Sequence, residues 1–109
     1  MLEPEWFTPE YQPDERNEVA FLLRPLDQRN AFNLERSMAA HDGLPDFDAC
    51  AAAFQYAVSD WRGLPREYSR EAVREALTVT SRRWRIWIGQ IAAEAYRRAN
   101  LSEDERKNS

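Results

Sequence analysis

The feature that most constrains this chain is a long helical periodicity between residues 61 and 101, with apolar residues on two sides. On a helical wheel with about 100° per residue, one sector gathers a stripe that we expect to face the core: Val73, Leu77, Thr80, Trp84, Trp87, Ile88, Ile91 and Ala95. A second group lies on roughly the opposite side: Ile86, Gly89, Ala93 and Tyr96. One apolar face is enough to pack a helix on its own domain. The second face therefore indicates a protein that works by holding another protein.

Length and composition place this helical region in a single small domain. The chain has 109 residues, of which 43% are hydrophobic, and this is typical of one globular unit with a modest core. We expect a mainly α, single-domain helical bundle of about four helices over residues 18–101. An extended N-terminal arm is expected at residues 1–17, which contain three prolines, and a flexible charged tail at residues 102–109.

Local signals set the expected boundaries in the first half of the chain. At most one short strand is expected, near Val19 to Leu23, because a proline at position 25 keeps the residue before it extended. Asp27 is expected to cap a helix that continues to about Ala40. A second helix begins at position 46 or 48, both aspartates, and continues to Trp61.

The second half begins with a further cap and leaves one boundary open. Ser69 is expected to cap the next helix, and the helical phase then holds from Val73 to Ala95. The segment Thr78-Val79-Thr80 is rich in β-branched residues, and Ser81 follows it. Two arrangements are therefore open. The helix either continues through this segment, or it breaks there and Ser81 caps a separate helix.

The residues that usually carry catalysis or bind metals are sparse. His41 and Cys50 are the only soft metal ligands and lie nine positions apart, and the glycines at 43, 63 and 89 form no phosphate-binding loop. We expect Cys50 to be a small buried filler. No apolar run approaches the length of a membrane span, and no leader peptide opens the chain. We therefore expect a cytoplasmic protein that is not an enzyme, has no cofactor and does not bind membranes.

Charge is divided unevenly along the chain. Residues 1–60 carry 12 acids and 4 arginines, whereas residues 61–109 carry 7 acids and 11 bases. Opposite charges in the two halves favour attraction within the molecule or self-association between copies. Arginines next to tryptophans near residue 84 would also suit nucleic acid, but the net charge of −4 and the inward position of those rings disfavour it.

Four short motifs, in order, resemble a known family. They are Trp6-Phe7-Thr8-Pro9, Phe21-Leu22-Leu23-Arg24-Pro25-Leu26, Val58-Ser59-Asp60-Trp61-Arg62-Gly63-Leu64, and Leu101-Ser102-Glu103-Asp104-Glu105-Arg106-Lys107-Asn108. Together they resemble the tail assembly chaperones of long-tailed bacteriophages and prophages. The similarity spans nearly the whole chain, although Ser59-Asp60 stands where the family often has glycine.

The resemblance implies a function in phage assembly. Such chaperones act in the host bacterial cytoplasm, bind the tape measure protein, keep it soluble and help recruit tail tube subunits. They are absent from the mature virion. Two other functions remain open from the sequence: a small structural tail or connector protein of the virion, and a small nucleic-acid-binding regulator.

The predicted binding face follows from the second apolar group. Three small residues would let a partner helix approach closely, between Ile86 and Tyr96 as anchors: Gly89, Ala92 and Ala93. Three arginines, Arg82, Arg85 and Arg97, are expected to pair with acids of the client or of a neighbouring copy. The alternative is that the N-terminal arm, through Trp6 and Phe7, folds back and covers this face.

Overall fold

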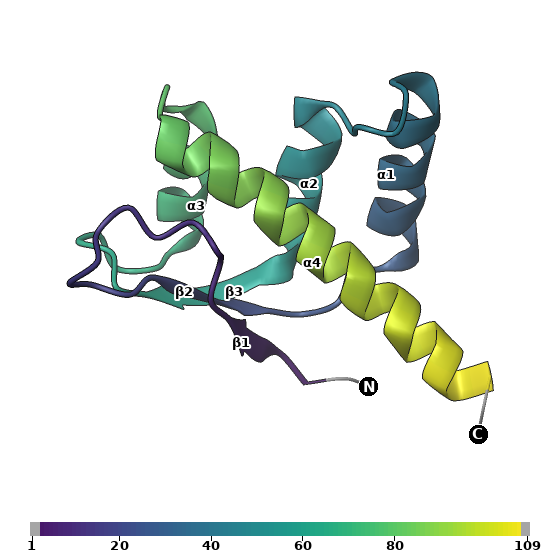
Figure 1. The fold of residues 1–109 in the computed structure, drawn as a ribbon, viewed down its shortest axis with the longest axis horizontal. Helices are drawn as coiled ribbons and strands as arrows, with labels where there is room; N and C mark the ends of the chain where they lie inside the picture. The colour runs from purple at the N-terminus through teal and green to yellow at the C-terminus, as the bar shows by residue number, and fades with distance from the viewer. Residues whose placement is uncertain (1–2, 108–109) are drawn as a thin grey trace.

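Four helices and a small antiparallel sheet make up the domain (Figure 1). The structure is a computed structural model that describes the backbone of residues 3–107 and the side chains of residues 3–101. The elements, in order, are β1 (Glu5–Phe7), β2 (Ala20–Leu23), α1 (Gln28–Ala40), α2 (Phe47–Ala57), β3 (Val58–Arg62), α3 (Arg70–Thr78) and α4 (Arg82–Lys107). The expected helix-rich single domain of four helices is therefore confirmed.

The sheet is the main departure from the expected fold, which allowed at most one short strand. Its strand order is β1-β2-β3, and both pairings are antiparallel. Only β2 lies where a strand was expected. The pairs Phe7↔Phe21 and Phe21↔Trp61 bring three aromatic residues into register across the sheet. Both β1 and β3 pair with β2 across more than ten intervening residues, so local patterns did not indicate them.

The expected N-terminal arm is a part of the folded domain. Its residues 5–7 form the edge strand β1, and Pro9 is fully buried. Gln12 holds the following loop, because its amide nitrogen donates to Val19 O at 2.9 Å and its Oε1 accepts from Val19 N at 2.8 Å. The Arg62 guanidinium lies 4.4 Å from the centroid of the Trp6 ring. The many prolines and acids of this segment therefore do not prevent it from packing.

Helix α2 ends earlier than the periodicity predicted. Phe54, Ala57 and Trp61 have helical spacing, yet the helix stops at Ala57 and the next five residues form β3, which pairs with β2. Sheet hydrogen bonds to a distant strand replace those of another helical turn, and the β-branched Val58 suits a strand. The start of α2 is settled as well, because the Asp46 side chain accepts a hydrogen bond from Ala49 N and caps the helix.

Two separate helices, α3 and α4, form the long helical region. Ser69 caps α3 as expected, and its Oγ accepts from Ala72 N at 2.9 Å. Ser81 Oγ accepts from Trp84 N at 3.4 Å, so the arrangement with a break before Ser81 is the one adopted. The predicted inward stripe is therefore divided between two helices and is not continuous. One of its residues, Thr80, lies in the break and is exposed.

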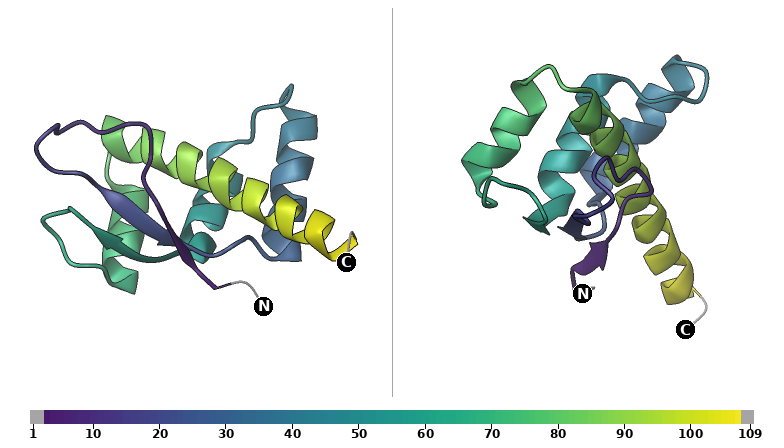
Figure 2. Two further views of the ribbon diagram at one scale, coloured as in Figure 1. Left: turned by 60° about the horizontal axis from the view of Figure 1, so that its bottom comes forward. Right: turned by 60° about the vertical axis from the view of Figure 1, so that its left-hand side comes forward.

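Helix α4 is the longest element and runs diagonally across the other helices (Figures 1 and 2). Its 26 residues correspond to about 39 Å at 1.5 Å per residue, close to the longest dimension of the molecule, 41 Å. The helix continues to Lys107, whereas we expected it to end near residue 101. No glycine or proline follows Gly89, so nothing in the sequence ends the helix earlier. Residues 108–109 of the expected tail lie outside the described residues.

The core lies where α4, α2 and the sheet meet. Rings from four elements pack edge to face there: Phe21, Phe54, Trp61, Trp84 and Trp87. Trp87 is fully buried, and its indole nitrogen donates to Tyr11 O at 2.9 Å. Cys50 is buried as expected, and burial, followed by the nearby Asp46 charge, raises the pKa of its thiol. The thiol is therefore protonated at neutral pH and suits a packing role.

Candidate protein-binding face of helix α4

The inward stripe of α4 lies where the sequence predicted it. Trp87, Ile88, Ile91 and Ala95 are buried, and Trp84 is half-buried. Ala92 is also buried, so the prediction that it leaves room for a partner helix is wrong. These residues pack mainly against α2 and the sheet, so they fix which side of α4 points outward.

The opposite side of α4 is open around its two smallest residues. Gly89 and Ala93 are exposed, and Ile86 is half-buried. Apart from the adjacent residues and the backbone of its own helical turns, a Cβ atom added at Gly89 would meet no described atom within 4 Å. Arg82 and Arg85 are exposed beside these residues, and neither forms an ion pair with any side chain in residues 3–101. We name these five residues the outer α4 face.

Two of the seven predicted binding residues have partners within their own chain. Tyr96 is half-buried, and its hydroxyl donates to Glu35 Oε1 on α1 at 3.0 Å. Arg97 forms a bidentate pair with Glu94, at 2.9 and 2.8 Å. Tyr96 therefore lies at the border between α4 and α1. The Arg97 side chain is 59% exposed.

The N-terminal segment does not cover the outer α4 face. It lies along a different side of the helix, where Tyr11 contacts Trp87 and the backbone of β1 contacts Arg98. On α4, Trp87 and Arg98 point well away from Gly89, because both lie more than a third of a turn from it around the helix axis. The alternative in which Trp6 and Phe7 shield Gly89 and Ala93 does not occur in this fold.

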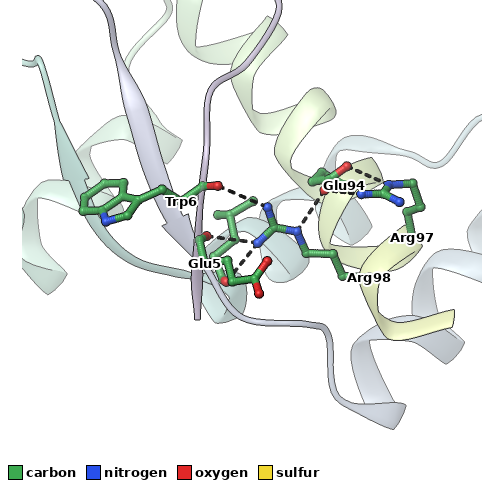
Figure 3. A network of polar contacts seen from close by, with 6 residues as sticks. Glu5, Trp6, Glu94, Arg97 and Arg98 are labelled. Atoms are coloured by element: carbon green, nitrogen blue, oxygen red, sulfur yellow. Dashed lines mark hydrogen bonds and ion pairs between the residues drawn. The ribbon is translucent and has the colours of Figure 1, made fainter. Parts of the chain in front are cut away.

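A network around Arg98 joins α4 to the sheet (Figure 3). Its Nε donates to Glu94 Oε2 at 2.8 Å, and one terminal nitrogen donates to Glu5 O at 3.0 Å and to Leu23 O at 3.2 Å. The other terminal nitrogen reaches Trp6 O at 3.5 Å. Arg98 thus connects α4 to β1 and β2 at once and holds the helix at a fixed orientation, with its outer face away from the sheet.

Acid should weaken this network through Glu94. The hydrogen bond from Arg97 lowers the pKa of the Glu94 carboxyl, with Arg98 contributing and burial opposing. A lowered pKa in the folded state means that the ionised carboxylate stabilises the fold above the usual glutamate pKa, about 4.3. This contribution is lost as the pH falls below that value. We therefore expect Glu94→Gln to be less stable at neutral pH by about 1 kcal/mol and to lose less free energy of unfolding between about pH 5 and about pH 3.

Urea unfolding followed by circular dichroism at several pH values measures this difference. Glu75→Gln is the matched control, because Glu75 is about half exposed in its ion pair with Arg66 and such pairs contribute little. Equal acid sensitivity of the Glu94→Gln variant and the native protein would show that the Arg98 network does not depend on the carboxylate.

The tryptophans that suggested nucleic-acid binding are not available for stacking on bases. Trp87 is fully buried, and Trp84 contacts Phe54 and Trp61 in the core. In the described part of the chain, no three side chains of His, Cys, Asp or Glu gather closely enough to hold a metal ion. Among the same residues, no helix is long and apolar enough to cross a membrane.

Sequence reasoning missed a second group of arginines. Arg24, Arg70 and Arg74 line one cleft, although Arg24 is far from the other two in the sequence. The only local signal is that Arg70 and Arg74 lie four residues apart on a helix, where like charges repel slightly. Only the tertiary structure shows that Arg24 faces the same space.

Comparisons of the chain with known protein families, with curated proteins and with solved structures find no match in any of the three.

Proposed function

We propose that this protein is an assembly factor that holds another polypeptide, and that it is a tail assembly chaperone of a long-tailed phage or prophage. In this function it binds the tape measure protein, keeps it soluble and helps recruit tail tube subunits in the host bacterial cytoplasm. It leaves before the virion is complete. The observation that carries the proposal is the outer α4 face, on which four of the five residues are exposed: Arg82, Arg85, Gly89 and Ala93.

The shape of the outer α4 face suits an amphipathic helix as the partner. Gly89 and Ala93 lie one turn apart, are exposed and have the smallest side chains, so the backbone of a second helix can approach closely. Ile86 offers an apolar contact at one end. Arg82 and Arg85 stand free beside it for acids on the partner. Glycine inside a helix lowers its stability by about 1 kcal/mol relative to alanine. Packing does not require a glycine at position 89, so its presence there favours a role in binding a partner.

The motif order of the sequence is the second support. Three of the four motifs that resemble the chaperone family coincide with the three strands: Trp6-Phe7 in β1, Phe21 to Leu23 in β2 and Val58 to Arg62 in β3. Their aromatic residues face one another across the sheet. The resemblance therefore rests on residues that build the fold, whereas the proposed client contacts lie on α4.

The Gly89→Glu variant tests this function. The added side chain has free space around it, so the monomer should remain folded, with a native circular dichroism spectrum. A glutamate in the contact would lose its hydration and meet acids of the client. We expect a cost of about 2 kcal/mol or more, which corresponds to a roughly thirtyfold loss of affinity. The measurement is the soluble fraction of the tape measure protein when it is produced together with each variant.

Ala39→Glu is the matched control, because it adds the same charge at an exposed position of α1. It should keep the client soluble. A folded Gly89→Glu protein that solubilises the client as well as the native protein would refute the role of the outer α4 face.

Mass spectrometry of purified particles separates the chaperone from a structural connector. A chaperone is absent from finished virions, whereas a connector is present in a fixed copy number. The free arginines on α4 keep a nucleic-acid-binding regulator as a further candidate. That function predicts duplex DNA binding that weakens steeply with salt.

A further inference from the structure

A second polar site lies away from the outer α4 face. A cleft of about 390 Å³ opens between the end of α2, the start of β3 and α3. Three of its nine lining residues are Arg24, Arg70 and Arg74, and none of the nine is an acid. The chain as a whole has 19 acids and 15 bases. The cleft is therefore a local concentration of positive charge on an acidic protein. We name it the arginine cleft.

Arg24 is held rigidly at one side of the arginine cleft. Its Nε donates to Tyr56 O at 2.8 Å, and its guanidinium carbon lies 3.9 Å from the centroid of the Tyr56 ring. Within residues 3–101, its two terminal nitrogens have no hydrogen-bond partner. The guanidinium is thus fixed in direction with two donor groups left over, so little side-chain entropy remains to be lost when an anion binds.

Arg70 and Arg74 supply the other side of the cleft from one face of α3. They lie one turn apart and are exposed, and no carboxylate in the described part of the chain pairs with either of them. Helix α3 has two acids of its own, Glu71 and Glu75, and neither lines the cleft. Glu75 pairs with Arg66 instead. Two like charges at this spacing destabilise a helix slightly. A bound anion between them would convert this repulsion into attraction.

The surroundings favour carboxylates over phosphate as the bound groups. Phosphate sites in proteins commonly use backbone N–H groups from glycine-rich loops or from a free helix N-terminus. No glycine lines the arginine cleft. The first turn of α3 is already capped, because Ser69 Oγ accepts from Ala72 N. Guanidinium forks form bidentate pairs with carboxylates and with phosphate alike, so the preference for carboxylates rests on the missing backbone donors. Gln55 and Ser59, also in the lining, add uncharged polar groups.

We propose that the arginine cleft binds an acidic segment of a partner polypeptide, through at least two of its carboxylates. This binding site is additional to the outer α4 face, and it does not depend on the proposed client of that face. Its volume lies within the range of ligand sites and admits a short stretch of acidic side chains.

Fluorescence anisotropy with a fluorescein-labelled, glutamate-rich peptide tests the proposal, and the same peptide with glutamine in place of glutamate is the ligand control. At an ionic strength of about 0.15 M, where the Debye length is about 8 Å, we expect the glutamate peptide to bind and the glutamine peptide not to bind. The double variant Arg70→Gln/Arg74→Gln should bind about tenfold more weakly or worse. Arg29→Gln/Arg36→Gln removes two exposed arginines of α1 and should bind as the native protein does.

Four outcomes would overturn the proposal, three of them in the native protein and the arginine variants and one in the Gly89→Glu variant. The first is no binding of the glutamate peptide to the folded native protein. The second is equal affinity in the two double variants, which circular dichroism must show to be folded. The third is tighter binding of inorganic phosphate or duplex DNA, dependent on Arg70 and Arg74. The Gly89→Glu variant should bind the peptide normally, and a loss of binding there would place the peptide on α4 and equally refute the arginine cleft.

Discussion

Replacing Trp87 with alanine is expected to remove most of the stability of this domain. The side chain is fully buried and contacts the rings of Tyr11, Phe21 and Trp84. Truncation leaves a large cavity among rings that cannot move together, and such changes cost about 3–5 kcal/mol. Because a small domain is stable by only about 5–15 kcal/mol in total, the variant should be partly unfolded or close to it. Urea unfolding followed by circular dichroism measures the loss.

Two further tryptophan variants separate the causes. Trp87→Phe keeps an aromatic ring but cannot donate to Tyr11 O, so it should lose less than the alanine variant. Trp6→Ala is the control, because Trp6 is 40% exposed on the edge strand and should cost about 1 kcal/mol or less. If Trp87→Ala and Trp6→Ala lose similar stability, the core is not centred on α4 as described.

The second large effect is expected at Gly63, which follows β3. Its φ of +87° lies in the left-handed region, and an added Cβ would sit 2.2 Å from Glu18 O, which is backbone. Glu18 precedes the buried Val19, so this backbone cannot move without disturbing the start of β2. We expect Gly63→Ala to cost about 3 kcal/mol or more, from about 1–2 kcal/mol of backbone strain together with the displacement of the Glu18 carbonyl.

The other two glycines are controls that separate the backbone strain from the close contact with Glu18. Gly43 has a φ of +92° but open space around it, so Gly43→Ala should show the backbone strain alone, about 1–2 kcal/mol. Gly89 is helical and has open space, so Gly89→Ala should stabilise the protein by about 1 kcal/mol. The order expected from urea unfolding is therefore Gly89→Ala most stable, then Gly43→Ala, then Gly63→Ala. A Gly63→Ala variant as stable as Gly43→Ala would contradict the close approach to Glu18.

The arginines around the two proposed sites fall into two groups, according to whether an acidic side chain of the same chain pairs with them. Arg97 and Arg98 pair with Glu94, and Arg66 pairs with Glu75. Within the described side chains, the arginines of the outer α4 face and of the arginine cleft have no acidic partner. In the first group, Arg98 joins α4 to the sheet, whereas the Arg66–Glu75 pair is about half exposed and contributes little. The second has its charges available for another molecule, which is why both proposals centre on it.

Helix content and helix starts were predictable from the sequence because their causes are local. Asp27, Asp46 and Ser69 all cap helices, since a cap depends on residues only two or three positions away. The inward stripe of α4 from Trp87 to Ala95 follows from the helical repeat alone. The helical period likewise placed Gly89 and Ala93 on the outer side.

Only the tertiary structure decided the sheet and the arginine cleft. Residues 5–7 and 58–62 become strands because both pair with β2, which lies far from each in the sequence, and no local pattern records such a pairing. Arg24 meets Arg70 and Arg74 for the same reason, since folding brings α3 beside the end of β2. Short-range periodicity and capping thus determined how many helices form and where α1, α2 and α3 begin. Contacts between distant segments determined where the chain became extended and where its unpaired charges gathered.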